Sequence, residues 1–109
     1  AAGLPDIGER YPDTDPANKG ADSRRFIAEV LGDLRRSGLV PVNLDIVIQA
    51  ERPKLSAHKA SIRDSVAQLL GLSPDRVAVK AKTNEGLDAI GRCEAVGCVA
   101  VVGLMSISC

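Results

Sequence analysis

The chain has 109 residues, 45% of them hydrophobic, and its aromatic residues are one Tyr and one Phe. This length suits one compact domain, 1–109, with an aliphatic core. Lys plus Arg equals Asp plus Glu at 14 each, so no overall field draws the chain to nucleic acid or to an anionic membrane. Cys93, Cys98 and Cys109 lack CxxC spacing, which predicts reduced thiols rather than a disulfide framework or a zinc knuckle.

The chain opens with AAGLP, which lacks an initiator Met and has the pattern of a helix ending at Gly3 and Pro5. This pattern predicts that the sequence begins inside a longer protein. Residues 6–24 follow as a polar run of Asp, Gly and Pro that we expect to be too broken for a helix or a strand. Such a run is either a solvated connector or a binding loop, since long loops in small domains are often functional.

A helix is predicted next, because apolar residues recur at helical spacing from Phe26 to Leu34. Asp22 or Ser23 can cap its start, and we expect it to end near Gly38. Residues 44–50 then alternate apolar and polar side chains, which predicts a strand.

A second helix is expected after the segment ERPKLS, with Ser56 as its cap and Gly71 as its end. The sequence SPDR at 73–76 predicts a short capped turn, with Pro74 in the first-turn position. Residues 77–82 alternate again and predict a second strand.

The last element, residues 94–107, is apolar on both alternating sets of side chains. A strand buried on both faces reads as such a continuous run. We expect one face to rest on the two helices and the other to be covered by a second copy in an oligomer. The alternative is that an amino-terminal part of the same protein covers it. The run is too short and too rich in Gly and Ala to span a bilayer, and no signal peptide is visible.

Three polar segments stand beside predicted element ends: residues 6–24, ERPKLS at 51–56 and KAKTNEG at 80–86. Ligands of sheet-and-helix domains collect beyond strand ends. Lys80 and Lys82 share one strand face, with Thr83 and Glu85 just past them, a combination that suits a phosphate and a divalent metal. An edge strand with solvated lysines would have the same pattern.

Four further polar residues have no role that the pattern alone decides. Lys54 is either another phosphate contact or an ordinary loop lysine. Arg92 and Glu94 form either a plain ion pair or part of a charged ring where copies of the strand meet around an axis. His58 is the only histidine, and a lone histidine makes neither a zinc site nor a catalytic dyad, so it is assigned no role.

Several segments carry a family resemblance: GLPDIG, YPDTDP with KGADSR, NLDIVIQAERPKLSAH, and VKAKTNEGL with IGRCEA. Together they cover nearly the whole chain, and the chain closely resembles the methylerythritol cyclodiphosphate synthase family of isoprenoid precursor biosynthesis. The resemblance implies an α+β subunit, with a mixed β-sheet, helices packed on one face and the other face in a homotrimer interface. The 109 residues would be the carboxy-terminal two-thirds of such a subunit.

The resemblance also implies substrate contacts for several residues of this sequence. Two match positions that hold the ribose, namely Asp6 and Gly8. Three match the loop that faces the methylerythritol part, namely Tyr11, Asp13 and Asp15. Four match the loop that encloses cytosine, namely Ala50, Lys54, Leu55 and Ser56.

The diphosphate segment matches at Lys82, Thr83 and Glu85. By resemblance, Thr83 is the catalytic residue that stabilises the transition state, and Glu85 is a ligand of Mg²⁺ or Mn²⁺. Arg92 matches a position near the phosphate end of the site or the trimer axis.

The implied reaction is that of a phosphorus-oxygen lyase. The 2-phosphate of CDP-methylerythritol 2-phosphate attacks its own β-phosphate and expels CMP. The family also uses Zn²⁺ held by one Asp and two His, and these ligands lie upstream of the sequence given, so none is expected in this chain. The implied partners are the CDP substrate, CMP and two further copies of the chain, with neither nucleic acid nor membrane, in the bacterial cytoplasm or the plastid stroma.

Two hypotheses follow from the missing zinc ligands. The first is a cyclase whose zinc-binding segment lies in an upstream part of the protein. The second is a shortened, non-catalytic relative that serves as a trimeric nucleotide-binding or scaffold protein.

Overall fold

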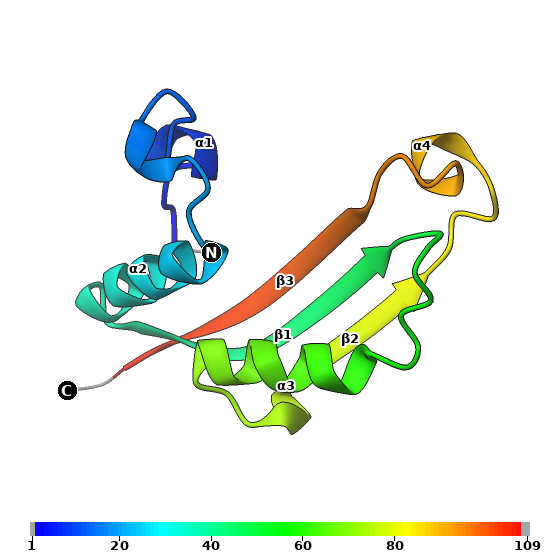
Figure 1. Cartoon of the computed structure of the whole chain (residues 1–109). Helices are drawn as coiled ribbons and strands as arrows, with labels where there is room; N and C mark the ends of the chain where they lie inside the picture. The colour runs from blue at the N-terminus through cyan, green and yellow to red at the C-terminus, as the bar shows by residue number, and fades with distance from the viewer. Residues whose placement is uncertain (1, 108–109) are drawn as a thin grey trace. The chain divides into compact units, whose positions relative to one another are not determined.

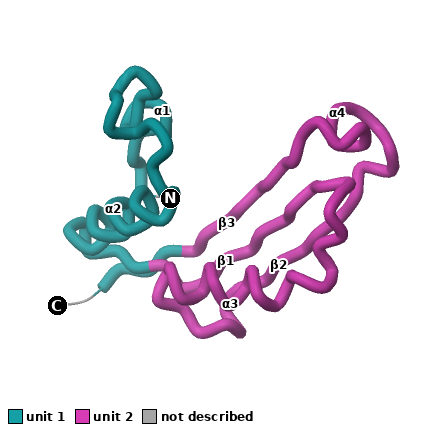
Figure 2. Tube along the Cα trace, in the orientation of Figure 1, with its two compact units in different colours: residues 1–40, 104–109 teal, residues 41–103 magenta. Residues whose placement is uncertain are grey.

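The computed structural model describes residues 2–107. It divides into two compact units, residues 1–40 with 104–109 and residues 41–103 (Figure 2). Within the described residues, no helix is both long enough and apolar enough to cross a membrane.

The first unit begins with two short helical turns, and an aspartate caps the start of each. Helix α1 spans Ile7–Arg10, the 3-10 turn η1 spans Pro16–Asn18, and both have an Asp at the N-cap. Asp6 accepts a hydrogen bond from the backbone N of Glu9 at 2.8 Å, and Asp15 accepts one from Ala17 at 3.0 Å. The expectation that residues 6–24 are too broken for a helix was therefore wrong, because a side-chain acceptor at the first position satisfies the free backbone donors of a short turn.

Helix α2, Ser23–Arg36, begins and ends as the sequence predicts. Asp22 is its N-cap and accepts a hydrogen bond from the backbone N of Arg24 at 2.9 Å. Gly38, just past its end, has a φ of 74°, a left-handed conformation that favours glycine. Gly3 has a similar φ of 71°. The helix expected to end there would precede residue 2 and so lies outside the described residues.

The second unit contains most of a mixed three-stranded sheet in the order β2-β1-β3. Strand β1 spans Leu39–Gln49, β2 spans Val77–Lys82 and β3 spans Gly97–Ser106, so β1 begins five residues before the predicted position 44. Strands β1 and β2 are parallel, with Leu44 opposite Val77 and Gln49 opposite Lys82. Strand β3 runs in the opposite direction along the other side of β1 (Figure 1).

Helix α3, Lys59–Leu70, starts two residues later than a cap at Ser56 predicts. The reason is a turn ahead of the helix, in which the backbone N of His58 donates to the carbonyl of Leu55 at 2.8 Å. His58 therefore occupies the N-cap without a side-chain capping bond, and the predicted cap was wrong. The end at Gly71 is confirmed, and the predicted turn after it is the 3-10 turn η2, Pro74–Arg76.

The core of this unit lies between α3 and one face of β1 and β2 (Figure 1). It consists of Leu44, Ile46, Ala67 and Val77, which are at most 8% exposed. The opposite sheet face is polar, and there Lys80 pairs with Asp45 at 3.6 Å. The predicted α+β class, with a helix packed on one sheet face, is confirmed.

Strand β3 has solvent-exposed side chains on both faces within residues 97–103. On one face of the strand, the side chains of Val99 and Val101 are 64% and 65% exposed. On the other face, Cys98 and Ala100 are also exposed. The core against α3 contains residues of β1 and β2 but none of β3. The expectation that a helix covers one face of β3 was therefore wrong for this unit. Cover by a second copy stays a prediction.

Candidate functional site

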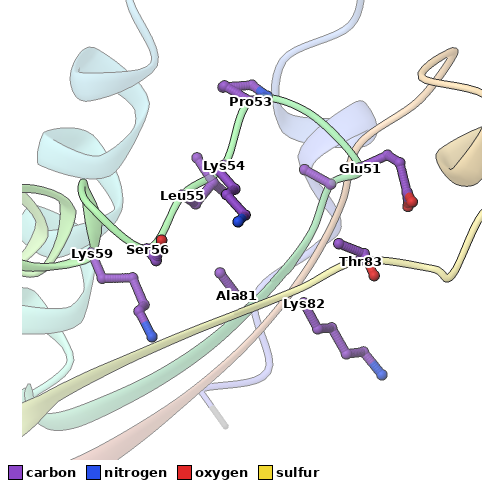
Figure 3. Close-up of a pocket in the computed structure, with 10 residues that line it drawn as sticks. Glu51, Pro53, Lys54, Leu55, Ser56, Lys59, Ala81, Lys82 and Thr83 are labelled. Atoms are coloured by element: carbon purple, nitrogen blue, oxygen red, sulfur yellow. The ribbon is translucent and has the colours of Figure 1, made fainter.

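A pocket of about 160 Å³ lies where β1 and β2 end and α3 begins (Figure 3). Six predicted site residues line it: Ala50, Lys54, Leu55, Ser56, Lys82 and Thr83. Glu51, Pro53, Lys59 and Ala81 complete its walls. The volume is below the roughly 300–1,000 Å³ of ordinary ligand pockets, so this unit encloses only part of a nucleotide-sized ligand.

The two strands bring the walls of the pocket together because they are parallel. Their carboxyl ends lie at one edge of the sheet, and the backbone N of Ala50 donates to the carbonyl of Lys82 at 3.0 Å just beyond the regular ladder. The chain then turns through a cis peptide between Arg52 and Pro53 toward α3. The loop after β1 thus faces the end of β2, as expected for strand-end ligand sites.

The charged side chains of the pocket are mainly cationic. Lys54, Lys59 and Lys82 line it, with Glu51 as the acidic group. Figure 3 shows Lys54 reaching into the space between the loop and β2, while Lys82 extends away from the loop. A pocket that three lysines and one glutamate line attracts anions.

The turn after β2 is held by its own hydrogen bonds. The Thr83 hydroxyl oxygen accepts from the backbone N of Glu85 at 3.3 Å, and the Asn84 side-chain amide donates to the carbonyl of Leu87 at 2.8 Å. Glu85 has a left-handed φ of 54° and is exposed. This turn also meets the loop after β1, because the Asn84 backbone N donates to the Glu51 carboxylate at 3.1 Å.

Arg92 follows the short helix α4, Asp88–Gly91, and pairs with Glu94 through its Nε at 3.1 Å. The predicted ion pair between these residues is therefore present. Arg92 is not among the residues that line the pocket, and a contact with substrate stays a prediction.

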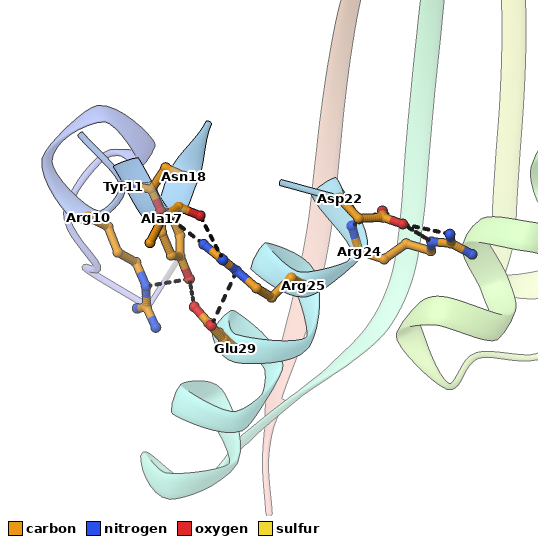
Figure 4. A network of polar contacts seen from close by, with 8 residues as sticks. All are labelled: Arg10, Tyr11, Ala17, Asn18, Asp22, Arg24, Arg25 and Glu29. Atoms are coloured by element: carbon orange, nitrogen blue, oxygen red, sulfur yellow. Dashed lines mark hydrogen bonds and ion pairs between the residues drawn. The ribbon is translucent and has the colours of Figure 1, made fainter. Parts of the chain in front are cut away.

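The predicted residues of the opening segment lie in the first unit, where two of them act as the caps described above. Tyr11 is held by side chains of its own unit (Figure 4). Its ring centroid lies 4.2 Å from that of Phe26, and its hydroxyl donates to Glu29 at 2.5 Å and accepts from the Nε of Arg10 at 3.0 Å. Arg25 fixes the neighbouring turn by donating to the carbonyl of Ala17 at 3.2 Å.

These contacts anchor residues 10–18 to α2 rather than leave them as a free connector. Gly8 and Asp13 are exposed, and so are the cap residues Asp6 and Asp15. Their contacts with a substrate stay predictions.

Two carboxyl groups of the chain have lowered pKa values. The Arg24 guanidinium, which binds the Asp22 carboxylate at 2.6 Å, holds the pKa of Asp22 at about 2, with help from the Arg24 backbone N. The Ser73 hydroxyl, which donates to Asp75, lowers the pKa of that carboxyl. Both groups are exposed, and both shifts arise from local hydrogen bonds rather than from burial.

The donor groups of this chain decide which metal ions it could hold. Residues 2–107 contain no group of three His, Cys, Asp or Glu side chains placed to hold a metal ion. These residues therefore do not fit a zinc ion. Magnesium is commonly held by one or two carboxylates and substrate phosphates, and the exposed Glu85 fits that role as a single ligand.

Sequence reasoning missed Lys59 and gave Glu51 no role of its own. Lys59 is the first residue of α3, and a helix starting there instead of at Ser56 places its first turn against the loop. The signal that could have found it is a lysine three residues after the polar loop. The role of Glu51 had no local signal, because its partner Asn84 lies 33 residues away.

Comparison with known proteins agrees with this geometry. The model of the YgbB family matches residues 1–105. The 2-C-methyl-D-erythritol 2,4-cyclodiphosphate synthase of Gemmatimonas aurantiaca is 45% identical over 107 residues, which make up 98% of this chain and 64% of that protein. This chain thus spans slightly less than two-thirds of the length of that curated relative.

Solved structures show the same fold. The bifunctional IspDF of Campylobacter jejuni superposes with a TM-score of 0.91 at 39% identity, over 98% of this chain and 29% of that one. A 2C-methyl-D-erythritol-2,4-cyclodiphosphate synthase solved with CDP bound gives 0.85 at 37% identity, over 94% and 66% of the two chains.

The fold and the pocket define an α+β protein with a cationic site at the ends of two parallel strands. The family match over almost the whole length narrows this class. The chain belongs to the YgbB family, and the resemblance found in its sequence is confirmed.

Proposed function

We propose that the protein containing this chain is a 2-C-methyl-D-erythritol 2,4-cyclodiphosphate synthase. The observation that carries the proposal is the pocket, in which the two segments predicted to enclose cytosine and to bind the diphosphate face each other. Support also comes from the relatives that carry this name at about 45% identity. The substrate proposed is CDP-methylerythritol 2-phosphate, and the products are the cyclic diphosphate and CMP.

The reaction needs positioning more than proton transfer. The attacking group is a phosphate that is already an anion, so no general base is required. The loop at 50–56 would hold the base against Ala81, since Leu55, Pro53 and Ala81 supply apolar walls. Lys54 and Lys59 would offset the charge of the phosphates.

Thr83 is well placed to stabilise the charge that develops on the β-phosphoryl group. Its hydroxyl oxygen accepts from the Glu85 backbone N at 3.3 Å. A hydroxyl has one proton to donate besides its acceptor sites, so this bond orients Thr83 while its proton stays available for a phosphate oxygen. Glu85 would serve as one ligand of Mg²⁺ or Mn²⁺, which neutralises phosphate charge when bound.

A homotrimer with sites completed by neighbouring subunits is part of the same proposal. The support is the small volume of the pocket and the exposed apolar strand β3, with Val99 and Val101 about two-thirds exposed. Zinc in the complete protein is proposed from the family resemblance alone, and no step is derived through it.

The proposal is tested by CMP release from CDP-methylerythritol 2-phosphate by the full-length protein, with zinc and magnesium supplied. Turnover that depends on the divalent metals is expected, and its absence under these conditions would contradict the proposal. The Lys59→Ala variant should raise KM about 3- to 10-fold, because it removes one pocket charge, worth roughly 1 kcal/mol.

Lys80→Ala is the matched control. It removes one lysine of the same unit, but Lys80 is not among the residues that line the pocket, and it pairs with Asp45. Its KM should stay within about twofold of wild type. Equal effects of the two substitutions would show that overall charge, rather than the pocket, attracts the substrate.

A further inference from the structure

We propose that Glu51 is a positioning residue, which locks the turn carrying Thr83 and Glu85 to the loop at 50–56. The proposal rests on the proposed function and deepens it, since it adds a residue that acts through others. Its basis is the 3.1 Å hydrogen bond from the Asn84 backbone N to the Glu51 carboxylate.

This bond joins two segments that are otherwise held locally. In the part of the chain that the structure describes, the other hydrogen bonds of residues 83–87 run within residues 83–91. The regular pairing of β1 and β2 ends at Gln49 and Lys82, and the Ala50 to Lys82 bond is the last backbone link. Beyond that point, the hydrogen bond to the Glu51 carboxylate connects the loop to the turn.

Asn84 lies directly between the two residues that the reaction needs. Thr83 precedes it and Glu85 follows it, with Glu85 in a left-handed conformation at a φ of 54°. Such a backbone persists only when its surroundings hold it. Fixing the Asn84 amide therefore fixes the direction of the Thr83 hydroxyl and of the Glu85 carboxylate together.

The negative charge of Glu51 distinguishes the positioning role from direct binding of the substrate. It is the acidic group of a pocket that three lysines line. A carboxylate there opposes the binding of an anionic substrate, so removing it should leave the affinity for CDP unchanged or improve it. The expected loss is confined to turnover, because misplacing a catalytic group by a small distance affects the transition state most.

The test compares Glu51→Ala and Glu51→Gln in the full-length protein. Glutamine keeps a carbonyl oxygen that can accept from Asn84, whereas alanine does not. We expect Glu51→Ala to lower kcat about tenfold without raising KM, and Glu51→Gln to stay within about threefold of wild type. Amide hydrogen exchange at Asn84 should be faster in the Ala variant and close to wild type in the Gln variant.

Asp64→Ala is the matched control, because it removes one exposed carboxylate from the outer side of α3. It should leave turnover and Asn84 exchange unchanged. The proposal is overturned if Glu51→Ala keeps both its turnover and its slow Asn84 exchange. It is also overturned if Glu51→Gln lowers kcat as much as Glu51→Ala does, since the charge of Glu51, and not its hydrogen-bond acceptor, would then be responsible for the loss.

The two proposals can fail separately. If the wild-type protein releases no CMP, the proposed function has failed. The exchange rates of Asn84 and the affinities of the two variants for CDP then still decide whether Glu51 holds the turn. Equal exchange in wild type and Glu51→Ala would reject that role.

Discussion

Replacing Gly103 by alanine probes the contact between β3 and β1. The backbone N of Gly103 donates to the side-chain oxygen of Asn43 at 3.1 Å. A Cβ added at Gly103 would lie 2.4 Å from that oxygen and 3.2 Å from the Asn43 Cγ. Alanine therefore forces the Asn43 side chain to turn away, and the hydrogen bond is lost.

The expected change in the free energy of unfolding combines two destabilising contributions and one stabilising contribution. Loss of the hydrogen bond costs about 0.5–1.5 kcal/mol, and a displaced rotamer costs a further 0.5–1.5 kcal/mol or so. Alanine is favoured over glycine in a strand by roughly 0.5–1 kcal/mol. The net destabilisation by Gly103→Ala is thus about 1 kcal/mol. In an Asn43→Ala background the new methyl group meets Val42 Cγ2 at 3.4 Å, an ordinary van der Waals contact. The same substitution should then stabilise by roughly 0.5–1 kcal/mol.

Urea unfolding of the wild type, both single variants and the double variant measures this coupling. Protein concentration must be constant, because assembly would shift apparent stability. The expected coupling is about 2 kcal/mol, with a change of sign between the two backgrounds. Gly97→Ala is the control, since its Cβ would lie 3.3 Å from the flexible end of Gln49, which can move away. Equal effects of Gly103→Ala in both backgrounds would refute the reasoning.

Two further predictions concern the cap of α2 and the catalytic turn. Arg24 lowers the pKa of Asp22 to about 2, below an ordinary value of about 3.9. This carboxylate therefore stabilises the fold fully above pH 4 or so, and that contribution is lost as the pH falls through about 2. The urea midpoint of unfolding should fall less between pH 5 and pH 2 in the Asp22→Asn variant than in the wild type. If it falls by the same amount in both, Asp22 is not the cause of the pH dependence. Thr83→Ala should lower kcat roughly 10- to 100-fold and change KM less than threefold or so. A change confined to KM would contradict a role in the transition state.

Much of the fold follows from local sequence patterns. The start of α2 was predicted at Asp22 or Ser23 and the end of α3 at Gly71, because capping and left-handed turns are decided by the residue itself and its near neighbours. The alternation of side chains predicted strands β1 and β2, and in the structure Leu44 and Ile46 lie in the core while Asp45 lies on the opposite face.

Other features needed the folded chain. Ser56 has the chemistry of a cap, yet the turn from Leu55 to His58 delays the helix to Lys59. Tyr11 was predicted to face the substrate, but sequence alone did not predict that its hydroxyl is bound to Glu29. In both cases several local conformations satisfy the same residues, and contacts between segments select one.

The sequence by itself determined the family, the order of the two long helices and of the strands, and most residues of the pocket. These depend on residue types and short spacings, which are visible in one chain. Only the tertiary structure decided that Glu51 meets Asn84, that Lys59 lines the pocket, and that β3 is open on both faces. The physical reason is that parallel pairing of β1 and β2 brings together residues more than 30 positions apart, and no local pattern records that contact.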